Sequence, residues 1–214
     1  IFVTGTDTEV GKTRISVGLI KVLQQQGLRV AAMKPVASGC EWRDGQLQNE
    51  DALALSQQAD IKLPYSQVNP YAFEPAIAPH LAAEQVGETI SLTVIESQFA
   101  AMRLQADAVV VEGAGGWLVP LNDQQTIADL AKALKLPVVL VVAIKLGCIN
   151  HALLTVQAIA DSGLNLVGWV ANDFLNDSQS TAIIQSLKQR ITAPCLGIVP
   201  RLAQDEDASA YLTL

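Results

Sequence analysis

Short apolar runs alternate with stretches of helical pattern along this chain. Several of the runs are apolar at every position, which is typical of parallel strands covered by helices on both faces. Strands are expected at six runs: Ile1–Thr4, Leu28–Met33, Ala108–Val111, Val138–Ala143, Leu166–Ala171 and Leu196–Val199. Between them the sequence predicts five helices: Lys12–Gln25, Leu92–Gln105, Ala128–Leu134, Ala152–Asp161 and Thr181–Arg190.

The order of these elements predicts the fold class. Gly27, Gly163 and the pair Leu136-Pro137 stand where helices should end. Strand–helix alternation of this kind gives right-handed βαβ units in one doubly wound sheet. We therefore expect an α/β fold, with a mostly parallel sheet and helices on both faces.

The stretch 63–80 breaks the alternation because it carries four prolines, at positions 64, 70, 75 and 79. Prolines at that density exclude a regular helix or a central strand. Apolar and aromatic residues are interleaved with them, so we expect an ordered excursion across the surface. With no linker, repeat or low-complexity segment in 214 residues, a single domain over 1–214 is expected.

Composition narrows the class of partner. Half of the residues are hydrophobic and the mean hydropathy is +0.30, as in a compact enzyme with buried strands. The formal net charge is −7 and there is no Lys/Arg run, which argues against nucleic acid or acidic lipid as the main partner.

The three cysteines (Cys40, Cys148 and Cys195) are scattered, as in a reducing compartment, and are better explained as small apolar side chains than as catalysts. No apolar run reaches the roughly 18 residues that span a bilayer. No secretory signal is visible, although the sequence starts at Ile1 without a methionine, so a cytoplasmic location is expected.

The strongest chemical signal is the segment "VTGTDTEVGKT", Val3 to Thr13. A strand, a loop with a glycine at each end, Lys-Thr and a helix follow one another, which is typical of a P-loop that wraps a phosphate chain. Lys12 would reach the terminal phosphates and the Thr13 hydroxyl would bind Mg²⁺. Five residues separate Gly5 from Gly11, one more than usual. The alternative is a glycine-rich turn that merely starts a helix.

Two acidic residues are candidates for the magnesium that accompanies a nucleotide. Glu112 ends the buried run "AVVVE" and precedes Gly113–Gly116, at the edge where parallel sheets bind ligands. The alternative is a solvated acid at an ordinary turn. Asp51 follows Asn49-Glu50 at the expected start of a helix, where the helix dipole alone favours acids.

Lys34 and Lys145 each follow an expected strand. Either lysine can point into the crevice at the carboxyl edge or extend along the surface, but together they favour a cationic floor beside the phosphate loop. Asn150 reads as an N-cap. His80 and His151 lack partners at ligand spacing, so a metal site built on them is not expected.

Two features of the sequence indicate which nucleobase is bound. The Asn-Lys-x-Asp stretch that reads guanine does not occur. Asn172 follows an expected strand and its amide can read adenine, which favours ATP.

Five motifs, "GTDTEVGKT", "KPVASG", "VEGAGGW", "KLGCINH" and "GWVAND", occur in the order and spacing of the dethiobiotin synthetase family, and the tail "GIVPRLAQ" continues the match. The chain therefore resembles this family over nearly its whole length. The resemblance implies a homodimeric, Mg²⁺- and ATP-dependent ligase of biotin synthesis that acts on 7,8-diaminopelargonic acid and CO₂. One amine would form a carbamate, the γ-phosphate would convert it to a carbamic–phosphoric anhydride, and the second amine would close the ureido ring.

The resemblance also implies a role for each matching residue. Catalytic roles fall on Lys34, Lys12 and Thr8, and metal binding falls on Thr13, Asp51 and Glu112. Nucleotide binding falls on Glu9, Val10, Gly11, Lys12, Thr13, Arg14, Asp51, Glu112, Gly113, Ala114, Gly115, Asn172, Asp173, Pro200, Arg201 and Leu202. Substrate binding falls on Thr8, Ser38, Gly147, Cys148 and Asn150, the last three meeting the substrate carboxylate across the dimer interface.

The sequence departs from the family pattern at Ile183-Ile184, where some members carry a tyrosine for the substrate carboxylate, and at Arg201. The alternative function is a partition-type P-loop ATPase switch. Those proteins carry an additional lysine early in the loop, where this chain has Thr6-Asp7-Thr8. An amidating enzyme of the cobyrinate type would need a glutaminase domain, for which the chain has no room.

Overall fold

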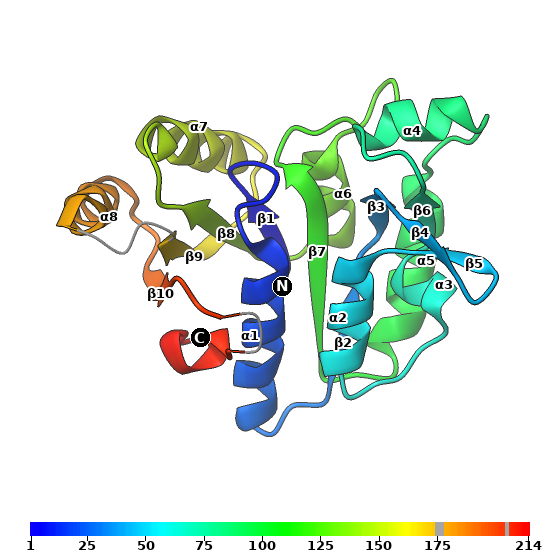
Figure 1. Ribbon diagram of the computed structural model, residues 1–214, viewed down its shortest axis with the longest axis horizontal. Coiled ribbons are helices and arrows are strands. Elements are labelled where there is room, and N and C mark those ends of the chain that lie inside the picture. The colour runs from blue at the N-terminus through cyan, green and yellow to red at the C-terminus, as the bar shows by residue number, and fades with distance from the viewer. Residues whose placement is uncertain (174–177, 204–205) are drawn as a thin grey trace.

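A six-stranded parallel sheet forms the centre of the computed structural model, which describes residues 1–173, 178–203 and 206–214 (Figure 1). Its strands are β1 (Phe2–Gly5), β2 (Val30–Met33), β7 (Ala108–Gly116), β8 (Val138–Ala143), β9 (Leu166–Asp173) and β10 (Cys195–Pro200). They lie in the order β10-β9-β8-β1-β7-β2, and every neighbouring pair is parallel. The predicted α/β class and all six predicted strands are confirmed. Gln204, the last residue of the tail motif, lies outside the described residues.

β1 lies in the middle of the sheet, with β7 on one side and β8 on the other. Phe2 pairs with Val111 and with Val138. The loop that follows Gly5 therefore opens at the centre of the carboxyl edge, where doubly wound sheets bind ligands. The order of the strands places the phosphate loop there.

Helices cover both faces of the sheet, as predicted. Alternate residues of β8 separate the two cores: Val139 and Val141 pack with α1 (Lys12–Gln25), whereas Leu140 and Val142 pack with α7 (Cys148–Asp161) and α8 (Ser178–Arg190). On the α1 face lie also α2 (Glu50–Gln58) and the short 3₁₀ helix η1 (Ala208–Tyr211), and on the other face α5 (Leu92–Arg103) and α6 (Ile127–Leu134). All five predicted helices are present.

Two boundaries differ from the prediction. β7 continues from Val111 to Gly116, so Glu112 lies inside a strand and not in a turn. The strand continues because Gly116 still pairs with Gly5 of β1 after an irregularity in the register. Asn150 is not an N-cap: Gly147, with φ 88°, caps α7, and the helix begins at Cys148. A glycine adopts this left-handed backbone easily, so the helix begins earlier than the polar side chain suggested.

The segment between β2 and α5 forms a layer beside the sheet. It contains β3 (Val36–Ser38), β4 (Glu41–Arg43), β5 (Gln46–Gln48), α3 (Tyr65–Val68), β6 (Tyr71–Phe73) and α4 (Pro79–Gln85). β3 pairs with β6 in a separate two-stranded sheet, and β4 and β5 form a hairpin. The proline-rich stretch thus holds a single helical turn and a strand outside the central sheet, as predicted, but its last two residues begin α4, because a proline is tolerated at the first position of a helix. In the part of the chain that the structure describes, no helix is both long and apolar enough to cross a membrane.

Candidate active site

The phosphate loop has a backbone of alternating handedness. Glu9 has φ 58° and Gly11 has φ 89°, with Val10 between them. The Val10 side chain is fully buried and lies over Gly5, where an added Cβ would lie 2.5 Å from Val10 Cγ2. Gly5 is therefore required for this packing. The ammonium of Lys12 donates to the Asp7 carbonyl at 2.9 Å, so it lies back across the loop.

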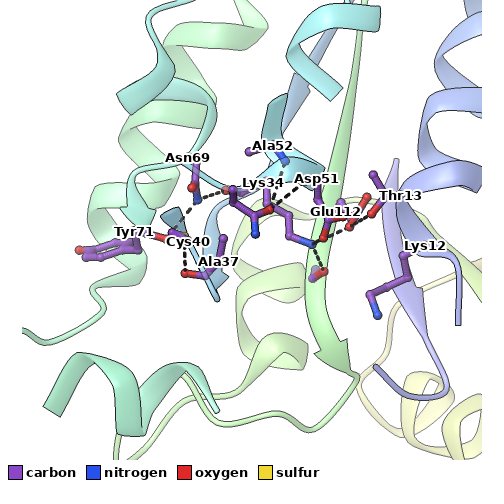
Figure 2. Close-up of polar contacts among 12 residues, drawn as sticks. Lys12, Thr13, Lys34, Ala37, Cys40, Asp51, Ala52, Asn69, Tyr71 and Glu112 are labelled. Carbon is purple, nitrogen blue, oxygen red and sulfur yellow. Dashed lines mark hydrogen bonds and ion pairs between the residues drawn. The ribbon is translucent and has the colours of Figure 1, made fainter. Parts of the chain in front are cut away.

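Four side chains from four elements meet beside this loop (Figure 2). Lys34 Nζ, just after β2, lies 2.6 Å from Glu112 Oε1 in β7 and 3.0 Å from Asp51 Oδ2 in α2. The Thr13 hydroxyl of α1 donates to Glu112 Oε1 at 3.0 Å. Lys34 is 4% exposed and Glu112 is fully buried. The structure thus brings together the predicted lysine, both predicted acids and the P-loop threonine.

Burial and charge act in opposite directions on these groups. Burial lowers the pKa of the Lys34 ammonium, but the carboxylates of Glu112 and Asp51 outweigh it and hold the pKa above its ordinary value. Burial, and then repulsion from Lys34, lower the pKa of Lys12 to about 8. Burial raises the pKa of the Asp51 carboxyl, but Lys34 and its hydrogen bond bring the net pKa below its ordinary value. Lys34 and Asp51 are therefore both charged at neutral pH.

A chain of hydrogen bonds positions Lys34 and Asp51. The sequence did not predict this chain. Asn69 Nδ2 donates to the Lys34 carbonyl at 2.7 Å, and Tyr65 Oη donates to Asn69 Oδ1 at 2.8 Å. Tyr65 Oη in turn accepts the backbone N–H of Asn49, whose side chain caps α2 by accepting the N–H of Asp51. An asparagine before two acids is a recognisable cap signal, whereas nothing in the sequence links Asn69 to Lys34.

A cavity of about 790 Å³ joins this cluster to the phosphate loop. Segments outside the predicted set, 76–79 with Ala37, Asn49 and Val119, complete its walls. The Ser38 hydroxyl is buried there and has no hydrogen-bond partner among residues 1–173, 178–203 and 206–214. The residues that line this cavity and that were predicted as site residues are Thr8, Glu9, Gly11, Lys12, Thr13, Lys34, Ser38, Asp51, Glu112, Ala114 and Gly115.

A second cavity of about 440 Å³ adjoins the first. Its lining consists of residues predicted to bind nucleotide: Gly11, Arg14, Asn172, Pro200, Arg201 and Leu202. Gly11 lines both cavities, so they meet at the N-terminus of α1. A ligand with a phosphate chain and a base can extend from one cavity into the other.

Other predicted residues lie elsewhere. Lys145 is exposed, with its Nζ 3.9 Å from Asp7 Oδ2, so the buried lysine beside Lys34 is Lys12 and not Lys145. Gly147, Cys148 and Asn150 begin α7 and line neither cavity; Cys148 is buried in the core. Three more residues predicted to bind nucleotide line neither cavity. Val10 is buried beneath the loop, and Asp173 is buried at the end of β9. The Gly113 carbonyl accepts a hydrogen bond from Lys34 at 3.4 Å.

The side chains around Glu112 could hold a magnesium ion. Among the described residues, no three His, Cys, Asp or Glu side chains form a group that could hold a metal. Magnesium, however, usually takes one or two carboxylates and completes its shell with water and phosphate oxygens. Among the residues that the structure describes, Glu112 Oε2 is buried without a hydrogen-bond partner, and the Thr13 hydroxyl and Asp51 lie beside the same carboxylate. Two acids and a hydroxyl next to a phosphate loop fit magnesium.

Solved structures share this fold at low sequence identity. A MinC:MinD cell division complex of Aquifex aeolicus has a TM-score of 0.61 at 12% identity, covering 95% of this chain and 81% of that chain. A ParA family ATPase of Chlorobium tepidum has a TM-score of 0.57 at 14% identity, covering 95% of this chain and 85% of that chain. This likeness establishes the P-loop NTPase fold alone.

Sequence similarity is much closer to one group of enzymes. The chain is 52% identical over 218 residues to the ATP-dependent dethiobiotin synthetase BioD of Cellvibrio japonicus, covering 100% of this chain and 95% of that protein. It is 53% identical over 219 residues to the enzyme of the same name from Pseudomonas paraeruginosa, with the same coverage. The BioD 1 protein of Escherichia coli O157:H7 is 49% identical over 210 residues, covering 98% of this chain and 93% of that protein.

A family model described as an AAA domain also matches residues 1–209. The motifs, the phosphate loop with its buried Lys34–Glu112 pair, and an identity near 50% over the full length agree with one another. The chain belongs to the family of ATP-dependent dethiobiotin synthetases.

Proposed function

We propose that the protein closes the ureido ring of dethiobiotin from 7,8-diaminopelargonic acid and CO₂, converting ATP to ADP and phosphate. The observation that carries the proposal is the main cavity, which places the phosphate loop, two buried lysines and two carboxylates around one space of about 790 Å³. A diamine with a short apolar chain and the terminal phosphate of ATP can meet there.

The reaction brings two anions together. One amine takes up CO₂ to form a carbamate, and a carbamate oxygen attacks the γ-phosphorus while ADP leaves. The second amine then attacks the carbonyl carbon of the mixed anhydride and expels phosphate, which closes the ring. Lys34 and Lys12 would offset the repulsion between carbamate and phosphate, and loop N–H groups would stabilise the charge on the transferring group. Thr8 and Ser38, which line the same cavity, would contact the substrate.

Thr13, Asp51 and Glu112 would hold Mg²⁺. Bound there, the ion would neutralise phosphate charge during the transfer. Two observations support this: Glu112 Oε2 has no hydrogen-bond partner in the described part of the chain, and the second carboxylate and the hydroxyl are adjacent. The base of ATP would occupy the second cavity between Asn172 and the segment 200–202.

The proposed enzyme is a homodimer, as the family resemblance implies, in which Gly147, Cys148 and Asn150 would meet the substrate carboxylate across the interface; in their own chain they line neither cavity. Close to them, Leu146 is 97% exposed and Leu154 is 61% exposed. Sedimentation of the wild-type protein as a monomer at assay concentrations would contradict the dimer. Leu154→Glu should weaken the dimer and raise KM for the diamine more than KM for ATP.

The ligase reaction is tested by measuring phosphate release with each reactant omitted in turn. Release should require both the diamine and bicarbonate, and mass spectrometry should detect dethiobiotin. Lys34→Met should lower kcat by about 100-fold or more while KM for ATP changes only a few-fold. Lys188→Met, which removes an exposed lysine on α8, is the matched control. Equal ATP turnover without the diamine, or stimulation by DNA, would instead support an ATPase switch.

A further inference from the structure

Asn172 bonds directly to the phosphate loop. It lies in β9, is 3% exposed and lines the second cavity. Its Nδ2 donates to the Val10 carbonyl at 2.9 Å, across 162 positions of the sequence. A carbonyl oxygen can only accept, so the nitrogen of the amide must face Val10. This bond therefore fixes which way the Asn172 side chain is turned.

The loop needs such a restraint because of its backbone conformation. Val10 lies between two residues of positive φ. The left-handed backbone conformation is energetically unfavourable for Glu9, which has a Cβ, but not for Gly11. Backbones of alternating handedness turn successive N–H groups toward one side and form a concave anion site. The loop can present that site only while the peptides around Val10 keep their orientation.

Two contacts hold Val10. Packing of its side chain over Gly5 fixes its position, and the bond from Asn172 fixes the direction of its carbonyl. The peptide between Val10 and Gly11 is planar and trans, so the Gly11 N–H points away from the carbonyl and hence away from Asn172. Asn172 thereby sets the direction of an N–H at the junction of the two cavities.

We propose that Asn172 is a positioning residue for the phosphate loop, in addition to contacting the base. The proposal rests on the proposed function in one respect, namely that this loop binds the phosphates of ATP. A residue that only reads the base cannot affect a ligand without a base. A residue that holds the loop must also affect the binding of a bare phosphate chain.

The experiment compares Mg-ATP with magnesium tripolyphosphate, which has the phosphate chain but no nucleoside, by isothermal titration calorimetry. Asn172→Ala and Asn172→Leu are both neutral and cannot donate, and the leucine preserves most of the volume. Each should weaken tripolyphosphate binding about 3- to 10-fold, the equivalent of one hydrogen bond, and weaken ATP binding further. Leu202→Ala, which also changes the lining of the second cavity, should weaken ATP binding while leaving tripolyphosphate binding unchanged.

Hydrogen exchange in the ligand-free protein gives a second readout. Peptides covering residues 6–14 should exchange faster in both Asn172 variants, and peptides from α8 should be unchanged. Unchanged tripolyphosphate affinity together with weaker ATP binding would show that Asn172 only reads the base, and the proposal would be wrong. Faster exchange throughout the sheet would indicate a general loss of structure and would also contradict a local role. A wild-type protein that binds neither ligand would instead overturn the proposed nucleotide function.

Discussion

Replacing Lys34 with methionine removes the ammonium from between two carboxylates, of which Glu112 is fully buried. Methionine fills similar space but cannot pair with either acid. In the variant, Glu112 keeps the hydroxyl of Thr13 as a donor but loses its counter-charge at 2.6 Å. We expect a less stable protein whose stability depends more strongly on magnesium than that of the wild type.

The expected loss is set by Glu112, because the Asp51 side chain is 43% exposed and solvent screens its pairing. Removing one partner of a buried ion pair typically costs about 3–5 kcal/mol. For a chain of this length each kcal/mol lowers the melting temperature by about 2–4 °C, so the midpoint should fall by roughly 6–20 °C.

Magnesium should reverse part of this loss. In the wild type the ammonium lies 2.6 Å from Glu112 Oε1 and repels a cation that binds the same carboxylate, whereas the methionine of the variant carries no charge there. A ligand that binds only the folded state stabilises it by about 2.7 kcal/mol at a hundred times its Kd. Tighter binding by the variant therefore gives a larger rise in midpoint at any given concentration.

The assay is scanning calorimetry with and without Mg²⁺, in the absence of nucleotide. Lys188→Met is the control, and the double variant Lys34→Met/Glu112→Gln should lose less stability than the sum of the single variants. The reasoning is refuted if magnesium raises the midpoints of the wild type and the Lys34 variant equally, or if the two single substitutions are additive.

Three further outcomes follow from local contacts. Lys62 Nζ donates to three carbonyl oxygens at the end of α2, at 2.7–3.0 Å, so Lys62→Met should lower the free energy of unfolding in urea by about 1 kcal/mol. A Cβ at Gly197 would collide with the backbone oxygen of Tyr211, so Gly197→Ala should cost about 1–3 kcal/mol and make the C-terminal segment easier to cleave in limited proteolysis. The N–H of Val30 donates to Asp60 and holds the pKa of that carboxyl below its ordinary value, so the stability it adds is present at neutral pH and is lost as the pH falls below about 4. The difference in unfolding free energy between wild type and Asp60→Ala should therefore shrink in acid, and a constant difference would contradict this assignment.

Much of the fold could be predicted because its strands are apolar on both faces. The run Val138–Ala143 was predicted with its observed bounds, since six consecutive apolar residues suit a strand covered on both sides. The meeting of Lys34 and Glu112 could be expected only in outline. Both were placed at the carboxyl edge, but their contact depends on β2 lying beside β7, with Met33 opposite Val111. No local pattern encodes which strands are neighbours.

Tertiary contacts account for the parts that could not be predicted. The bonds from Asn172 to Val10 and from Asn69 to Lys34 join residues distant in sequence, so no spacing reveals them. The β4–β5 hairpin did carry a local signal, because Asp44-Gly45 is a favoured hairpin turn and both residues have positive φ. The roles assigned to individual site residues remain predictions until the variants are measured.

The central place of β1 also affects how the chain is made. β1 is synthesised before the other five strands of its sheet, yet its pairing partners are β7 and β8, at Val111 and Val138 for Phe2. At about 5–20 residues per second, translation would leave both edges of β1 unpaired for roughly 5–22 s, until Val111 of β7 is made, and the β8 edge unpaired for roughly 7–27 s. The phosphate loop can take its final shape only after β8 and β9 have emerged from the ribosome, because Val141 of β8 accepts the Thr6 N–H and Asn172 of β9 donates to Val10. ATP can therefore stabilise the chain only after these strands have been made, and it cannot template the earlier steps of folding.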